Sequence, residues 1–285
     1  MINFKDYSNI TKIVIPQNIQ MSTYNYSNMF AQMPNLKELN IAQSLTNIAH
    51  ICSGCSQLTN VTILNNNITN MVNAYSHCHK LIGEPHSGPN VTNMANAYAQ
   101  CYNITGSPAV GDKVKDGYYA YWSCYNLTGS PVAGEDLENM YMMYCGCYNL
   151  TGEPVCTNKV KNLSYAYRAC YNLTGSPACG PNVTHMALAY SYCENLTGDP
   201  VCGPKVVSMA GTYHECPGLT GPIAMSDQVE HIDGAYYNCK GVTGSPVCPS
   251  VAKTMAGTYA NCYRITGSPQ CNPNITNMAW TYDHC

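Results

Sequence analysis

The chain has 285 residues, a formal net charge of −3 and only 10% charged residues, against roughly 25% in a typical soluble domain. With no basic excess to neutralise phosphates, the composition argues against nucleic acid as a partner. No stretch approaches the roughly 20 consecutive apolar residues of a membrane span, and the first residues lack the apolar core of a signal peptide.

Residues 1–54 are the least regular part of the sequence. The segments NITKIVIPQNI (9–19) and NLKELNIAQSLTNIAHICSGC (35–55) share an L/I-x-x-I/L-x-I spacing of apolar residues. We interpret residues 1–54 as an N-terminal cap with divergent repeats.

From Cys55 to Cys285 a cysteine recurs every 23 residues, which defines ten full repeats. Self-similarity at a fixed period of this length indicates structural units that stack and bury a face that none could bury alone. Because nothing is inserted after Cys55, we predict a single elongated solenoid over residues 55–285.

Several positions of the repeat are constant when the cysteine is counted as position 1. Position 4 is Leu, Ile or Val, position 14 is aliphatic, position 17 is usually Met, and position 21 is Tyr in every repeat, as in Leu127, Leu137, Met140 and Tyr144. These rows predict one continuous core that runs from coil to coil.

The two halves of each repeat predict different local structure. The first half, as in CYNLTGSP, is dense in Gly and Pro, and position 8 is Pro in eight of ten repeats. Proline cannot donate to a central parallel ladder, so we expect little regular strand. In the second half, apolar residues at positions 14, 17, 20 and 21 favour a helical turn or two. The predicted fold is therefore a repeat solenoid with short parallel strands and short helical turns.

The pattern C-x-x-L-T, with an aliphatic at position 14, an apolar residue at 17 and Ala-aromatic before the next Cys, resembles BspA-like leucine-rich repeats. The spacing in residues 9–19 and 35–55 resembles the strands of that family, so the resemblance runs from about residue 7 to the last residue. It implies a right-handed, parallel-stranded coil stack used mostly as a surface binding or adhesion module. It implies no catalytic residues.

The 18 cysteines predict free thiols. A second cysteine row, at position 10, is interrupted by Met225, and Met can replace a packed thiol but not a disulfide partner. Free thiols point to folding in a reducing compartment. Cys52 and Cys55 have metal-ligand spacing but no second pair nearby, so we expect no metal and no cofactor. No His, Asp or Glu recurs in the array or lies in a nucleophile motif, and we expect no enzyme activity.

The thirteen N-x-S/T sequons follow from the repeat. Asn at position 3 can hydrogen-bond a neighbouring turn and form a ladder, which we favour over dense glycosylation.

Candidate binding residues are those predicted to point outward. Tyr has a flat apolar face with a polar tip and suits glycan or protein surfaces, although these rings could instead merely shield the corner of each coil. Position 2 and the variable positions 19, 22 and 23 supply the predicted ligand-binding set: Tyr102, Tyr125, Tyr148, Tyr171, Tyr263, Trp122 and Arg168.

Two functions are compatible with this sequence. The first is a non-enzymatic recognition or adhesion module that binds a host glycan or protein. Such a module would be extracellular and displayed on a cell surface, a phage tail or another part of a virion. The second is a structural spacer or fibre-forming subunit that assembles end to end. Because the sequence ends at Cys285 with apolar rows uncovered, we expect that end to meet another chain or another copy, or the polypeptide to continue.

Overall fold

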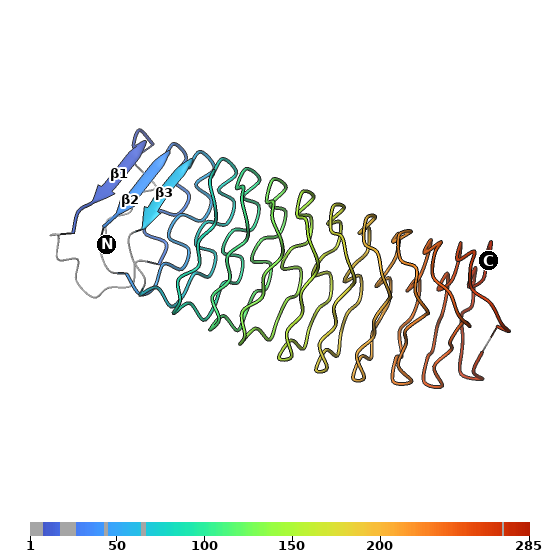
Figure 1. The fold of residues 1–285 in the computed structure, drawn as a ribbon. Helices are drawn as coiled ribbons and strands as arrows, with labels where there is room; N and C mark the ends of the chain where they lie inside the picture. Colours follow the sequence, from blue (N-terminus) through green and yellow to red (C-terminus); the bar gives the residue numbers. More distant parts are fainter. Residues whose placement is uncertain (1–7, 18–26, 43–44, 64–66, 270) are drawn as a thin grey trace.

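The computed structural model describes residues 8–17, 27–42, 45–63, 67–269 and 271–285. Successive repeats each form one coil of chain, and the coils stack in sequence order along a single long axis, with the strands at one end and the C-terminus at the other (Figure 1). The fold is that of a repeat protein with parallel strands.

Three short strands form a parallel sheet in the order β1-β2-β3: β1 (Lys12–Ile15), β2 (Glu38–Ile41) and β3 (Asn60–Ile63). Leu39 pairs with Ile13 on one side and Val61 on the other. Alternating side chains of β2 are buried, because successive residues of a strand point to opposite faces. The sheet continues across residue 54, and the division of the chain at that residue stays a prediction.

After β3 the described residues form no further strand, and strand-type pairing between coils is limited to isolated parallel bridges, as between Asn139 and Asn162. The expectation of little regular strand is confirmed. At position 6, glycines such as Gly129 have a positive φ of 79°, and Pro131 follows at position 8 without an amide hydrogen. These residues bend the segment that would otherwise continue the sheet.

The predicted helical turns are wrong: none of the described residues lies in a helix. Positions 19 and 23 have positive φ, for example 55° at Asn96 and 61° at Gln100, and this left-handed conformation interrupts any helix. The backbone N–H groups between these two positions donate alternately within their own coil and to the next coil. Ala97 N–H donates to Met94 C=O three residues back, whereas Tyr98 N–H donates to Ala120 C=O in the next coil. The apolar side chains whose spacing predicted a helix therefore lie on stacked turns.

The constant positions line the interior, as predicted. In the coil that begins at Cys124, the side chains of Leu127, Leu137, Met140 and Tyr144 are fully buried. The position-21 rings also stack from coil to coil, with centroids 5.2–5.9 Å apart. A single row of tyrosines therefore runs through the core of the array.

Each interior tyrosine also closes its own coil. The Tyr144 hydroxyl accepts a hydrogen bond from Val132 N–H at 3.3 Å and donates one to Val132 C=O at 2.6 Å. We call this pair of bonds the tyrosine clamp. It recurs in the coils of Tyr98, Tyr121, Tyr144, Tyr167, Tyr190, Tyr213, Tyr236 and Tyr259.

The recurring cysteine has a polar role as well as a packing role. The Cys147 thiol donates to the Tyr121 carbonyl of the preceding coil at 3.1 Å, and the other position-1 cysteines make the equivalent bond. A small, weakly donating, mostly apolar side chain suits this buried corner. All 18 cysteines are free in the structure.

Asparagines at position 3 also connect neighbouring coils. Asn149 Nδ2 donates to Tyr125 C=O at 3.0 Å, and Asn172 Nδ2 donates to Tyr148 C=O at 2.9 Å. The amide nitrogen that a glycan would modify is therefore engaged in holding two coils together.

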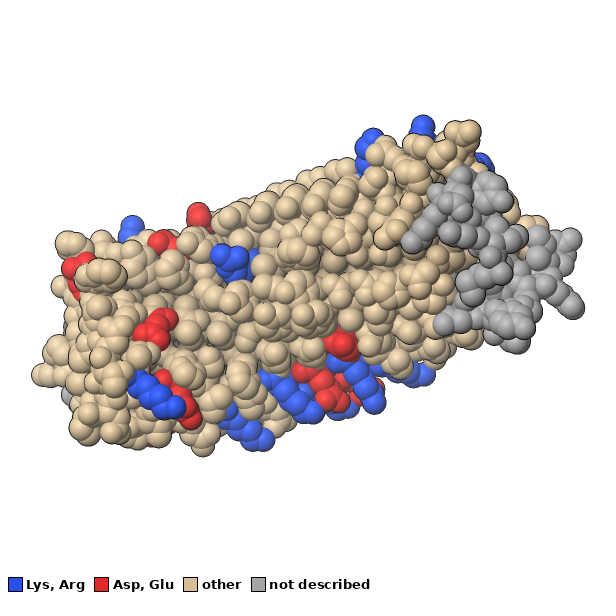
Figure 2. Space-filling view, turned by 180° about the vertical axis from the view of Figure 1, so that it is seen from behind, with Lys and Arg blue, Asp and Glu red and all other residues tan. Residues whose placement is uncertain are grey.

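Charged side chains pair with each other between coils. Lys159 and Asp136 lie 2.5 Å apart, as do Lys161 and Glu138. On the face that Figure 2 displays, Lys, Arg, Asp and Glu gather mainly along one edge of the array, and most of the remaining surface is uncharged.

Candidate recognition surface

Position 2 carries a stack of rings, which we call the aromatic stripe: His79, Tyr102, Tyr125, Tyr148 and Tyr171. Ring centroids are 4.8 Å apart, with planes within 5° of parallel, in each of the first three pairs. The Tyr148–Tyr171 pair opens to 5.3 Å and 30°. The structure thus brings together four of the predicted site residues over consecutive coils.

Stacking of the stripe determines what it presents to solvent. Because parallel rings less than 5 Å apart cover one another's faces, the outward part of the stripe is a row of ring edges and phenol hydroxyls. The stripe ends at Tyr171, because Glu194 follows it at position 2 of the next coil and leaves one face of the Tyr171 ring without a stacked ring. Both sequence interpretations, ligand contact and shielding of the corner, are compatible with this arrangement.

Tyr263 lies apart from the stripe. Its side chain is 57% exposed, makes no ring contact in the described part of the chain, and places its hydroxyl 3.5 Å from Asn261 Oδ1.

A second group of rings, the aromatic cluster, consists of Tyr118, Tyr119, Trp122, Tyr141 and Tyr165. Tyr118 and Tyr141 stack at 5.4 Å, whereas Tyr119 meets Trp122 edge-on at 5.3 Å and 89°. Tyr165 lies against Tyr141 at 5.7 Å with planes inclined by 57°. Because these rings are not all parallel, the cluster presents both faces and edges.

Sequence reasoning found only part of the aromatic cluster. Tyr119, Trp122 and Tyr165 occupy the variable positions 19 and 22, but Tyr118 and Tyr141 occupy position 18, where only two neighbouring repeats carry Tyr. The signal that could have located the cluster is the high density of aromatic residues in the segment YYAYW (118–122).

Two hydroxyls of the aromatic cluster, those of Tyr119 and Tyr141, stay protonated at neutral pH. Desolvation, together with the neighbouring Tyr118 and Tyr141 hydroxyls, raises the pKa of Tyr119 to about 12. Desolvation and the Tyr165 hydroxyl also raise the pKa of Tyr141. These phenols can therefore both donate and accept hydrogen bonds to a ligand.

The cluster and the stripe adjoin each other at Cys145. The Cys145 thiol lies close enough to Tyr141 of the cluster and to Tyr148 of the stripe to contribute to the raised pKa of both, after the larger effect of desolvation. Both groups of rings therefore lie near Cys145, and we call the two groups together the aromatic surface.

Arg168 places a positive charge beside that surface. It lies near the Cys145 thiol, opposing the rise that burial causes in the pKa of Cys145, and its guanidinium carbon is 6.0 Å from the centre of the Tyr192 ring. His214 and Tyr237 continue the aromatic surface with rings 4.6 Å apart. Desolvation lowers the pKa of His214, so this imidazole is neutral at physiological pH.

Two other kinds of site were sought in the residues that the structure describes. No group of three or more His, Cys, Asp or Glu side chains there could hold a metal ion. None of the described residues forms a helix with the length and apolar character needed to cross a membrane.

A known family of leucine-rich repeats matches the first part of the chain. Residues 2–105 match, in six copies, the family described as BspA type leucine-rich repeat region. Residues 2–105 are thus BspA-type leucine-rich repeats, and the resemblance seen in the sequence is confirmed for that part of the chain.

A search of the curated proteins finds no match to this chain. Among solved structures, a leucine-rich cell surface protein from Faecalibacterium prausnitzii A2-165 is 14% identical, with 95% of this chain and 88% of that chain covered and a TM-score of 0.35.

Proposed function

We propose that the chain is a non-enzymatic recognition module that binds a glycan across its aromatic surface. The observation that carries this proposal is the aromatic cluster, in which five rings from three successive coils meet at different inclinations on an outward side of the array. Tyr118 is 39% exposed even within that group.

The chemistry of the aromatic surface favours a sugar over a strongly charged ligand. Sugar rings have apolar faces and hydroxyl edges, which match ring faces and phenol hydroxyls that are held in place by their neighbours. Rigid aromatic side chains lose little conformational entropy on binding. With a net charge of −3, the chain offers little attraction to polyanions.

The predicted site residues take different roles in this proposal. Trp122 and the tyrosines of the cluster supply ring faces, while Tyr102, Tyr125, Tyr148 and Tyr171 supply a row of hydroxyls. Arg168 lies where it can contact an acidic substituent of the glycan. Tyr263 lies outside the proposed surface.

Exposure on a cell surface or a virion, with a glycan or protein of a host as the partner, is part of the same proposal. Its support is the BspA-type resemblance, which implies surface binding or adhesion, together with the outward aromatic surface.

Glycan-array binding by the full chain tests the proposal. We expect binding by the unchanged chain and a loss of at least about tenfold in the variant Tyr118→Ala with Tyr141→Ala, because truncating central aromatic anchors removes most of the binding energy. The variant Tyr125→Ala with Tyr148→Ala should weaken binding less.

Tyr263→Ala is the matched control, since it removes an exposed tyrosine outside the aromatic surface, and its binding should equal that of the unchanged chain. Equal loss in the control and the cluster variant would contradict the proposed site. Absence of glycan binding by the unchanged chain would contradict the function and favour the alternative, a structural subunit that assembles end to end.

A further inference from the structure

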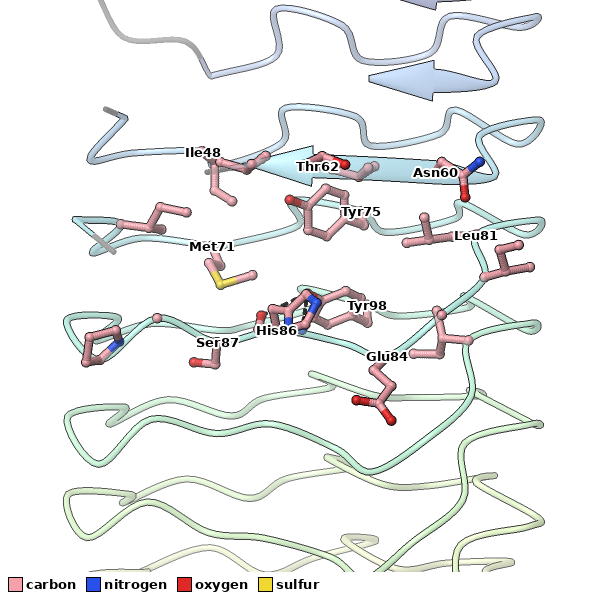
Figure 3. A pocket seen from close by; sticks show the side chains of 18 residues that line it. Ile48, Asn60, Thr62, Met71, Tyr75, Leu81, Glu84, His86, Ser87 and Tyr98 are labelled. Carbon is pink, nitrogen blue, oxygen red and sulfur yellow. Dashed lines mark hydrogen bonds between the residues drawn. The ribbon is translucent and has the colours of Figure 1, made fainter. Parts of the chain in front are cut away.

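A cavity of about 580 Å³ lies between the coil that contains β3 and the next coil (Figure 3). It shares no residue with the aromatic cluster. Ligand pockets for small molecules typically enclose about 300–1,000 Å³, so this volume is sufficient for a ring-sized molecule.

The cavity lies where two kinds of repeat meet. β3 is the last strand of the sheet, and Ile82 N–H to Thr59 C=O is the single backbone hydrogen bond that joins the described residues 59–63 to the following coil. That coil turns at Gly83, whose φ is 89°. A strand and a bent segment cannot stay in contact along their whole length, and the space between them remains open.

Tyr75 is the interior tyrosine of the coil that contains β3, and it lines the cavity. In the eight coils from Tyr98 to Tyr259 the hydroxyl is held by a tyrosine clamp to position 9. The corresponding position-9 residue for Tyr75 is Ile63, whose strand pairs with β2 instead. Tyr75 makes no such clamp, and its hydroxyl oxygen stays accessible from the cavity, although the residue as a whole is only 5% exposed.

A hydroxyl that is accessible from a cavity and not engaged by the protein can hydrogen-bond water or a bound ligand. Figure 3 shows the Tyr75 hydroxyl directed away from Leu81, toward the side of Ile48 and Met71. That side of the cavity is lined by buried apolar side chains, including Ile48, Ile68 and Met71. Polar side chains, among them Glu84 and His86, are exposed at the rim.

We infer that this cavity binds a small neutral molecule with an apolar, ring-sized body and one hydrogen-bonding group, which pairs with the Tyr75 hydroxyl. The apolar lining accepts the body of the ligand. A charged ligand is disfavoured, because no charged side chain lines the apolar side of the cavity to compensate for its desolvation. This inference is independent of the glycan proposal, since the two sites share no residue.

The test uses indole as the probe and the full chain with methyl-labelled methionine, observed by NMR. Indole has an apolar ring system and one N–H group that can donate to the Tyr75 oxygen. We expect the Met71 methyl signal to shift and saturate at about 1 mM indole, which is an affinity typical of a small fragment. The Met140 methyl, in the same interior row but remote from the cavity, should not move.

Two variants separate binding from folding. Tyr75→Phe keeps the ring and removes the hydroxyl, and we expect indole affinity to fall about threefold to tenfold, the range for one hydrogen bond. Tyr144→Phe is the matched control, because it removes a clamped hydroxyl far from the cavity and should leave indole affinity unchanged. Ile68→Trp should fill the cavity and abolish the Met71 shift.

A Met71 signal that does not respond to indole, or one that shifts together with Met140, would overturn the inference and leave the cavity as a water-filled junction. Unchanged affinity in Tyr75→Phe would overturn the assignment of Tyr75 as the polar anchor.

Discussion

The N-terminal sheet and the Gly-Ser-Pro array build the same stack of coils by different means. Between β1 and β3, neighbouring coils are joined by a strand ladder, in which β2 pairs with both of the other strands. From Tyr98 onward no strand is present among the described residues. Each coil from Tyr98 to Tyr259 is closed by a tyrosine clamp, and a cysteine thiol joins it to an earlier coil. A repeat can thus lose its strand when side chains satisfy the backbone groups that the strand would have paired.

Alkaline pH should produce the largest difference between the two regions. Burial raises the pKa of Cys216 from its ordinary value of 9.0 to about 12, and that of Tyr121 well above 10.0. Below pH 9 these groups are protonated in both the folded and the unfolded chain. As the pH rises above 9, the unfolded chain loses protons that the folded chain keeps, so stability falls progressively toward pH 12.

Hydrogen exchange across this pH range, corrected for its intrinsic pH dependence, would check the alkaline effect. Amides of the array should lose protection before those of β2, which has no ionisable side chain in its buried row. Tyrosines that ionise at their ordinary pKa while the array stays folded would contradict the clamp.

Tyr167→Ala should have the largest effect of any single substitution. The side chain is fully buried, and its hydroxyl donates to Val155 C=O at 2.7 Å. Truncation of a large core side chain costs about 3–5 kcal/mol of unfolding free energy, measured by denaturant titration. Tyr165→Ala, two residues away and partly exposed, should stay within about 0.5 kcal/mol. Equal losses would mean that the assignment of inside and outside is incorrect.

Gly134→Ala should have an intermediate effect that is specific to the array. A Cβ at Gly134 would lie 2.2 Å from the Gly111 carbonyl oxygen, which is a backbone atom and cannot rotate away. Overpacking of this kind costs about 1–3 kcal/mol. Gly203→Ala is the graded control, because its Cβ would be 3.0 Å from the Gly180 oxygen. The thermal midpoint of Gly134→Ala should be lower than that of Gly203→Ala. The reverse order would show that the coils can separate at this corner.

Surface ion pairs should contribute least to the stability of the folded chain, and their contribution should be equally small in the N-terminal sheet and in the array. Lys12 and Glu38 join β1 to β2 at 2.6 Å, and Lys159 and Asp136 join two array coils at 2.5 Å. All four side chains are more than a third exposed, so solvent screens the attraction. Glu38→Gln and Asp136→Asn should each leave the thermal midpoint within error, and a drop of several degrees in either would contradict this.

The sequence predicted the parts of the fold that repeat in every coil. Rows such as Leu127 and Tyr144 recur at fixed positions, and a constant apolar position in a stacked array has to face the core. The helical turn was wrong because stacked turns with a left-handed residue at Asn96 and Gln100 give apolar side chains nearly the same spacing as a helix. Side-chain spacing alone does not show where the amide hydrogens go.

Features that occur once could not be predicted in this way. The junction cavity depends on a mismatch between one strand and one bent segment, and the absence of a tyrosine clamp at Tyr75 follows from that mismatch. The aromatic cluster depends on Tyr118 and Tyr141, which are present in only two neighbouring repeats. Comparison of repeats within one chain finds what is constant, whereas binding surfaces are built from what varies.

The central claim is that tyrosines inside the array hold the coils together while tyrosines on the aromatic surface bind the ligand. Tyr141 and Tyr144 belong to the same coil, three residues apart, and permit the most direct measurement: glycan-array binding of Tyr141→Ala and Tyr144→Phe, at a temperature at which both variants are folded. We predict that Tyr141→Ala loses at least about tenfold in affinity while Tyr144→Phe binds like the unchanged chain. Equal binding by the two variants, or a greater loss in Tyr144→Phe, would contradict this division of roles.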